Sequence, residues 1–173
     1  MKKILIIATV VFTTNLCFSQ AASNVFDIAR KGTADQAKET LKKNINAFKT
    51  VNDEGFSPLT LACYRGNNEV AKLLIDNGSD INQKSTMGTP LMAAVVKGNI
   101  EIAKILIAKK ANLNETDSNG TTPLMYAVQF QNEEFIKLLL LNKADKTKSD
   151  KNGKTAFEYA VFAKNEQIIN LLK

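Results

Sequence analysis

A short motif that recurs at a nearly constant spacing is the feature of this sequence that most constrains its fold. Pro58, Pro90 and Pro123 occupy matching positions of this motif, and Ala156 occupies the next position of the same register. A glycine stands shortly before each of these positions, and a serine or threonine stands directly before each. A period of about 33 residues is typical of stacked repeats, in which each unit buries its apolar face against its neighbours.

The residues of each repeat predict a turn followed by two short helices. The glycine permits a tight turn. The hydroxyl residue can cap the free amides at a helix start, and proline just inside that start loses no needed donor. The second helix carries apolar residues at helical spacing, as in Val70, Leu73 and Leu74, so it buries one stripe.

This pattern resembles the ankyrin repeat, whose signature runs Asp-x-x-Gly-x-Thr-Pro-Leu-His-x-Ala. The sequence has Gly-Thr-Pro-Leu at 88–91 and Gly-Thr-Thr-Pro-Leu at 120–124. The resemblance implies an all-α ankyrin-repeat solenoid of helix-turn-helix pairs with β-turn fingers, with about five repeats including caps. It covers residues 23–173, divided into an N-terminal cap (23–51), three full repeats (52–84, 85–116 and 117–149) and a truncated C-terminal repeat (150–173).

The repeats depart from the signature in three ways. The signature histidine, which in the family ties successive units together, is replaced by Thr60, Met92, Met125 and Glu158. The unit 85–116 is one residue short between its glycine and its proline, which predicts an altered turn. The place of Gly78 at the end of a second helix is taken by lysine in the next two units, where a left-handed backbone is strained.

The N-terminal segment 1–19 predicts a secretory signal peptide. Lys2 and Lys3 precede an apolar run at 4–12 that is short for a membrane span, and small residues permit cleavage after Ser19 or Ala21. An uncleaved anchor is the alternative, whereas a lipoprotein signal is disfavoured because Leu16 precedes the cysteine. Loss of the two lysines lowers the formal charge from +6 to +4. We therefore expect a periplasmic or secreted protein with no stable membrane insertion after cleavage.

Only one cysteine, Cys63, remains after signal cleavage, so no internal disulfide is possible. Cys63 lies within the apolar run of a predicted first helix. A small buried hydrophobe is the favoured interpretation, because a reactive thiol needs an exposed and electropositive environment.

The sequence does not predict an enzyme, and we expect no catalytic, cofactor-binding or metal-binding residues. It contains no histidine, which removes the commonest general base and the commonest zinc ligand. The turn glycines are isolated and form no phosphate-binding loop. Glu133 and Glu134 are adjacent, so their side chains diverge on a helix, and early in a helix they complement its dipole.

The resemblance implies that partners contact the finger tips and the concave face lined by the first helices. The candidate partner-binding residues are Arg30, Lys31, Phe56, Tyr64, Arg65, Val96, Lys97, Gln129, Phe130 and Phe162. Basic residues dominate the first three units and aromatic residues the last two, and aromatics and arginine often anchor interfaces. Two alternatives stay open at this point. The cations lie at helix C-termini, where they offset the dipole, and the two phenylalanines could pack into the core.

These observations predict an exported scaffold that binds another protein with an acidic and partly apolar surface. It could serve as an accessory factor to a periplasmic protein, and a secreted effector or immunity-type binder is the alternative. A weak polyanion or nucleic-acid binder is a hypothesis of another class. We expect no nucleic-acid partner, because the charge of +4 is modest and the lysines are scattered among acids.

Overall fold

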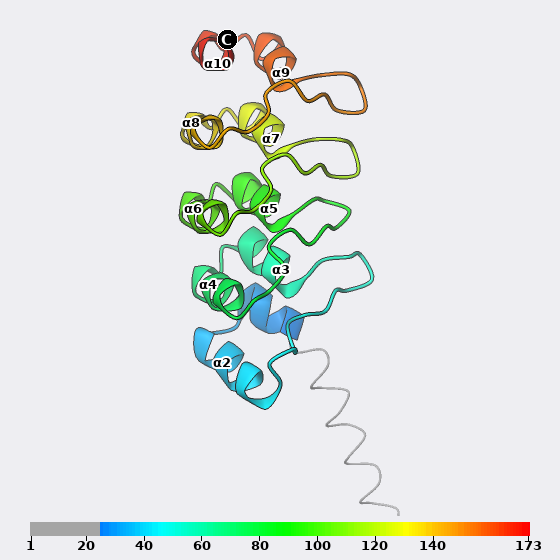
Figure 1. The fold of residues 1–173 in the computed structure, drawn as a ribbon, viewed down its shortest axis with the longest axis vertical. Coiled ribbons are helices and arrows are strands. Elements are labelled where there is room, and N and C mark those ends of the chain that lie inside the picture. Colours follow the sequence, from blue (N-terminus) through cyan, green and yellow to red (C-terminus); the bar gives the residue numbers. More distant parts are fainter. Residues whose placement is uncertain (1–24) are drawn as a thin grey trace, which may run out of the picture.

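The computed structural model describes residues 25–173, in which ten helices form five stacked pairs (Figure 1). The first helices of the pairs, here the inner helices, are 25–31, α3 (Pro58–Arg65), α5 (Pro90–Lys97), α7 (Pro123–Gln129) and α9 (Ala156–Phe162). The second helices, here the outer helices, are α2 (Ala34–Lys43), α4 (Asn68–Asp76), α6 (Ile100–Ala108), α8 (Glu133–Leu141) and α10 (Glu166–Leu172). Long loops project beside the inner helices in one row (Figure 1).

The predicted all-helical solenoid is confirmed. Within residues 25–173 the structure has no named strand, and the only extended pairing consists of two isolated bridges, Ser85–Gly88 and Ser149–Thr155. The expected signal peptide and both expected cleavage sites lie outside the described residues. No helix in the described part of the chain is long and apolar enough to cross a lipid bilayer.

The hydroxyl residues before the inner helices act as caps, as their position predicts. Ser57 Oγ accepts a hydrogen bond from the amide of Thr60 at 3.1 Å, and Thr122 Oγ1 accepts one from the amide of Met125 at 3.3 Å. Proline follows the cap in α3, α5 and α7. These local interactions fix where each inner helix begins and therefore where the finger before it must end.

The helix ends show the strain that the lysine substitutions predict. Gly78 has φ 75°, and Lys110 and Lys143 at the matching places have φ 70° and 66°. The ends of the inner helices show the same pattern. Gly66 and Gly98 have a left-handed backbone, and so does Lys164, which occupies the matching place in the last unit. A non-glycine residue in this conformation costs about 1 kcal/mol.

One continuous core runs through the stack from Val25 to Leu172. Leu59, Leu91 and Leu124 occupy the same position of their inner helices and are almost wholly buried. Cys63 is also fully buried, and burial raises the pKa of its thiol to about 12. The buried position favours the structural interpretation of this cysteine over a reactive thiol.

The chain lacks the signature histidine, and its successive units are joined in part by hydrogen bonds from asparagine side chains. Asn82 Oδ1 accepts a hydrogen bond from the amide of Asn112 at 2.8 Å, and Asn114 Oδ1 accepts one from the amide of Asp145 at 2.8 Å. Near the cap, Asn67 Nδ2 donates to the carbonyl oxygen of Gly32 at 2.9 Å, at the end of the helix 25–31. Loop asparagines thus supply some of the interunit hydrogen bonds, and outer helices supply others, as between Asn68 of α4 and Glu101 of α6.

The four projecting loops are here called finger 1 (52–56), finger 2 (85–88), finger 3 (117–121) and finger 4 (150–154). In finger 2 the missing residue produces the altered turn that the sequence predicts. Ser85 and Gly88 exchange two backbone hydrogen bonds of 3.0 and 3.1 Å. Gly88 has φ 95°, and a Cβ atom there would lie 2.0 Å from the sulfur of Met92. Only glycine fits this turn.

Candidate partner-binding face

The ends of the inner helices form the candidate face. We call it the inner-helix face and define it by residues in or next to the last turns of these helices: Arg30, Lys31, Tyr64, Arg65, Val96, Lys97, Gln129, Phe130 and Phe162. The units stack in register, so these positions form columns along the array (Figure 1). Most of these side chains are exposed, whereas Arg30 and Val96 are half-buried.

Three of the four cations of the inner-helix face have no acidic neighbour among the described residues. Among residues 25–173, no carboxylate lies within 4.0 Å of the charged nitrogens of Lys31, Arg65 or Lys97. Arg30 is the exception, since its Nη1 lies 3.5 Å from Asp27. The guanidinium of Arg65 lies 5.9 Å from the ring centroid of Tyr64, a contact that leaves its charge unneutralised.

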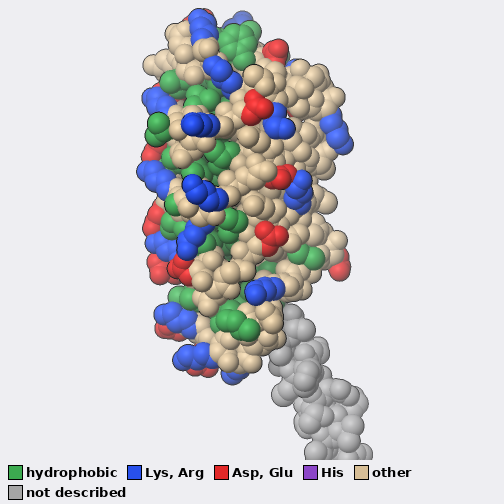
Figure 2. All heavy atoms as spheres, in the orientation of Figure 1, with side chains coloured by type: hydrophobic (Ala, Val, Ile, Leu, Met, Phe, Trp, Pro, Cys, Tyr) green, Lys and Arg blue, Asp and Glu red, His purple; other side chains and the backbone are tan. Residues whose placement is uncertain are grey.

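The cations of the outer helices show the opposite arrangement. Lys72 pairs with Glu101 of the next unit at 2.5 Å, and Lys104 pairs with Glu134 at 3.7 Å. Figure 2 shows basic and acidic side chains interleaved along the edge where Figure 1 places the outer helices. The hydrogen bond between Lys72 and Glu101 is the largest of the effects that raise the pKa of Lys72 and lower the pKa of Glu101. Each lysine within α4, α6 and α8 therefore has a carboxylate partner, whereas Lys42 and Lys43 of α2 have none among the described residues.

The aromatic end of the inner-helix face is exposed. Phe130 is 55% exposed and Phe162 is 81% exposed, so the alternative that they pack into the core does not hold. The ring of Phe130 stacks against Tyr126 of its own helix, with centroids 6.3 Å apart. The ammonium of Lys154 in finger 4 lies 5.2 Å from the centroid of Phe162 and 5.7 Å from that of Tyr159. These contacts hold the rings in defined positions beside the fingers.

Two tyrosine–aspartate pairs fasten fingers 3 and 4 to their inner helices. The hydroxyl of Tyr126 donates to Asp117 Oδ2 at 2.7 Å, and that of Tyr159 donates to Asp150 Oδ2 at 2.6 Å. The other carboxylate oxygen, Oδ1, accepts two finger amides in each case, from Asn119 and Thr121 in finger 3. These aspartates occupy the turn position of the repeat signature, and the signature itself does not predict their tyrosine partners. The signal that could have found the pairs is the constant separation between each aspartate and the tyrosine that follows it.

The pKa values of these groups follow from the contacts. The hydrogen bond from Tyr159, followed by that from the amide of Lys154, lowers the pKa of Asp150. Burial, and then the bond to Asp117, raises the pKa of Tyr126. The bond to Asp150 is the first cause that raises the pKa of Tyr159. The two tyrosines therefore keep their protons, and Asp150 keeps its charge, over the physiological range.

The remaining candidate residues occupy different environments. Phe56 lies in finger 1 but packs against the core and is half-buried, so it does not project from the finger tip. Val96 is half-buried, and Gln129 is exposed between the cationic and aromatic parts of the face. The structure thus brings the cations of the first units and the rings of the last units onto one face, and it sets Phe56 apart from them.

Within residues 25–173, no group of three or more His, Cys, Asp or Glu side chains is placed to hold a metal ion. The carboxylates of Asp117 and Asp150 are occupied by finger amides and tyrosines. What this arrangement offers is a patterned surface, basic at one end and aromatic at the other.

Comparison with known proteins identifies the repeat. The sequence model of a family described as "Ankyrin repeats (3 copies)" matches residues 25–117 and 110–173. An ankyrin repeat protein of Acanthamoeba polyphaga mimivirus is 40% identical over 77 residues, which are 44% of this chain. The aligned segment spans 8% of the length of the viral protein, so the similarity concerns the repeats alone.

Proposed function

Because the chain belongs to the ankyrin repeat family, whose repeats indicate a scaffold for protein–protein interaction, we propose that its inner-helix face holds a partner protein with an acidic and partly apolar surface. Ankyrin repeats generally bind other proteins, and the family typically consists of non-enzymatic binding scaffolds.

The observation that carries the proposal is the difference between the two sides of the stack. Each lysine within the outer helices α4, α6 and α8 has a carboxylate partner, whereas Lys31, Arg65 and Lys97 have none among the described residues. An unpaired cationic column attracts a surface of opposite charge and orients it during encounter. An acidic patch on the partner would face these three units.

The aromatic end supports the apolar part of the proposed interface. Phe130 and Phe162 are exposed, and their neighbours Tyr126 and Lys154 restrict the positions of the rings. Pre-positioned aromatic side chains lose little conformational entropy on binding and are common energetic centres of interfaces. Apolar groups of the partner would contact these two units.

We further propose that the protein works after export, as an accessory factor to a periplasmic protein. The signal-like residues 1–19 motivate this proposal. A secreted effector or immunity-type binder is the alternative. Immunodetection in periplasmic and medium fractions separates the two, and detection in the cytoplasm alone would contradict export.

The test of the face uses a matched pair of double variants. Affinity-tagged protein is crosslinked in its native envelope fraction to identify the partner, and binding is then measured by calorimetry. We expect Arg65→Ala with Phe130→Ala to weaken binding by at least about 100-fold, the loss of two interface anchors. Lys104→Ala with Leu141→Ala removes one cation and one exposed apolar side chain from the outer helices and should leave binding unchanged. Equal effects of the two double variants would refute the proposed face.

A further inference from the structure

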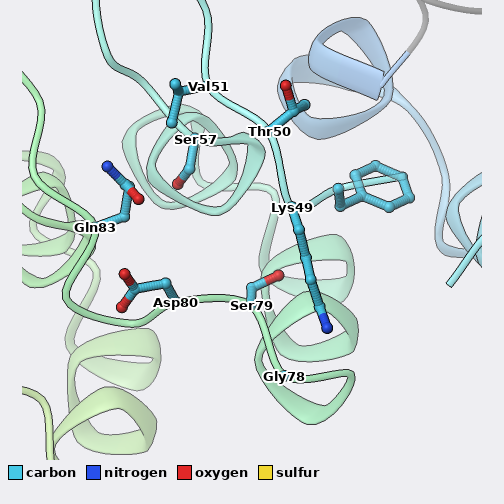
Figure 3. A pocket seen from close by; sticks show the side chains of 9 residues that line it. Lys49, Thr50, Val51, Ser57, Gly78, Ser79, Asp80 and Gln83 are labelled. Atoms are coloured by element: carbon cyan, nitrogen blue, oxygen red, sulfur yellow. The ribbon is translucent and has the colours of Figure 1, made fainter. Parts of the chain in front are cut away.

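A hollow of about 560 Å³ opens between the cap and the first full repeat (Figure 3). It is lined by the loop that follows α2, including Lys49, Thr50 and Val51, and by the loop that follows α4, including Ser79 and Asp80. None of its lining residues belongs to the inner-helix face. We call this hollow the junction slot.

The next two junctions show what lies between equivalent loops elsewhere in the stack. There, an asparagine side chain of one loop reaches the following loop and accepts a hydrogen bond from its backbone. Asn82 Oδ1 accepts from the amide of Asn112, and Asn114 Oδ1 accepts from the amide of Asp145, each at 2.8 Å. In both junctions an asparagine carboxamide oxygen therefore bonds to the same backbone position.

At the cap junction this bond is missing. The residue that matches Asn82 one unit earlier is Lys49, whose ammonium is a donor only. The amide that matches that of Asn112 one unit earlier belongs to Asp80, and it has no acceptor among residues 25–173. Asp80 is exposed at the edge of the hollow, so its amide is open to an acceptor from another molecule.

The walls of the slot favour a neutral polar side chain. Lys49 runs along one side and ends beside Gly78, while the carboxylate of Asp80 lies across the hollow (Figure 3). Asp80 Oδ1 is engaged by the amide of Asn82 at 2.9 Å. One cation and one anion leave no net charge to select a charged ligand. Val51, 46% exposed, adds an apolar surface for the neighbouring part of a chain.

We propose that the junction slot binds an asparagine side chain of an extended peptide segment from another protein. Its carboxamide oxygen accepts the hydrogen bond of the Asp80 amide, as Asn82 and Asn114 do for Asn112 and Asp145. The loop of Lys49, Thr50 and Val51 stays in place, and the segment lies across the mouth of the slot with its asparagine side chain directed inward. This site is separate from the inner-helix face, so its test does not depend on the partner of that face.

The experiment is a titration of the ¹⁵N-labelled full chain, followed by amide NMR. The probe is an acetylated and amidated peptide with the sequence of residues 78–84, the segment that docks on the following loop in the stack. The matched control peptide carries Asn82→Leu. We expect the Asp80 amide proton to shift downfield in a saturable manner with the asparagine peptide. The leucine peptide should bind on the order of tenfold more weakly, the loss of one hydrogen bond.

Two variants at one position keep the test independent of folding defects. Lys49→Asn supplies the oxygen from within the chain, so the Asp80 amide should exchange with solvent more slowly and the peptide should no longer shift it. Lys49→Met removes the charge but supplies no acceptor, so the peptide should bind as it binds the unaltered chain. The proposal is overturned if the Asp80 amide of the unaltered chain is already as protected as those of Asn112 and Asp145. It is also overturned if both peptides bind alike, or if Lys49→Asn leaves binding unchanged.

Discussion

Fingers 1 and 2 differ from fingers 3 and 4 in how they are attached to the body of the stack. In finger 1, Asn52 Oδ1 accepts the amides of Glu54 and Phe56 but has no tyrosine partner among the described residues. In fingers 3 and 4, an aspartate does the same and also accepts a tyrosine hydroxyl from the inner helix. Fingers at the same position of the repeat are therefore attached in two ways. Finger 1 is held by hydrogen bonds within its own turn, and fingers 3 and 4 are also bonded to a tyrosine hydroxyl of the inner helix.

The links between neighbouring fingers show the same difference. The amide of Lys151 in finger 4 donates to the carbonyl oxygen of Asn119 in finger 3 at 2.9 Å. A longer bond of 3.4 Å joins Ser118 to Thr86 of finger 2. Among residues 25–173, no backbone hydrogen bond joins finger 1 to finger 2. The aromatic part of the inner-helix face therefore lies beside the better-fixed fingers, and most of its cationic part lies beside the less-fixed ones.

The largest expected effect comes from removing the aspartate of finger 3. We expect Asp117→Ala to lower the free energy of unfolding by about 3 kcal/mol, because two amides and a tyrosine hydroxyl lose a buried charged acceptor. Asn52→Ala in finger 1 should cost only about 1 kcal/mol, because it removes a neutral acceptor of two amides. Urea denaturation of both variants measures the difference. Equal losses would mean that the tyrosine link adds nothing.

A smaller effect isolates the tyrosine hydroxyl itself. Tyr126→Phe deletes the donor to Asp117 while keeping the ring, and we expect it to lower the free energy of unfolding by about 1 kcal/mol. Tyr64→Phe is the control, since the Tyr64 hydroxyl has no hydrogen bond to the described residues. Hydrogen exchange should also show faster exchange of the finger 3 amides in Tyr126→Phe alone. If those amides exchange at an unaltered rate, the Tyr126 hydroxyl does not hold finger 3 to its inner helix.

The helix ends reverse the comparison, because here the C-terminal units carry backbone strain that the first full repeat avoids. The C-terminal units carry Lys143 and Lys164 in the left-handed conformation, at places where earlier units have glycine. Lys143→Gly or Lys164→Gly should raise the free energy of unfolding by about 0.5 to 1 kcal/mol, since relief of strain is partly offset by the entropy of glycine. Gly66→Ala in the first full repeat should lower it by about 1 kcal/mol. Thermal or urea unfolding tests both signs.

The smallest effect is a dependence on pH that finger 4 has and finger 1 lacks. The hydrogen bond from Tyr159 lowers the pKa of Asp150 in the folded chain, so the carboxylate stabilises the fold above its unfolded pKa. This stabilisation is lost as the pH falls through the lower folded value, which places the change in the acidic range below about pH 4. Asp150→Asn should lose less stability than the unaltered chain over that range. Parallel pH profiles of the two proteins would contradict the assignment.

The local parts of the structure follow from the sequence, because short-range chemistry determines them. A hydroxyl residue before proline predicts the start of each inner helix, and Ser57 and Thr122 cap their helices accordingly. The missing residue after Gly88 predicts an altered turn, and finger 2 has one. Cys63 in an apolar helical run predicts burial, and the side chain is buried.

The parts that depend on the spacing between units do not follow from local patterns. The bonds of Asn82 and Asn114 to the next loop require the units to stack at a particular distance, which no single repeat encodes. Periodicity also leaves the orientation of Phe130 and Phe162 open, because both lie at helix ends where the buried stripe stops. Phe56 is the opposite case. Its position in finger 1 predicts a projecting side chain, but in the structure its ring packs against the core.

The uneven links between the fingers have a mechanical consequence. A finger without a hydrogen bond to its neighbour moves more freely than a bonded one, and among the described residues this holds for finger 1 relative to finger 2. The helices of these two units stay joined through Lys72 and Glu101, so we expect the movement to be confined to the finger. Movement of finger 1 changes the surface beside the cationic end of the inner-helix face, while fingers 3 and 4 keep the surface beside the aromatic rings constant. A partner anchored on Phe130 and Phe162 would meet a cationic end that adjusts to its contour.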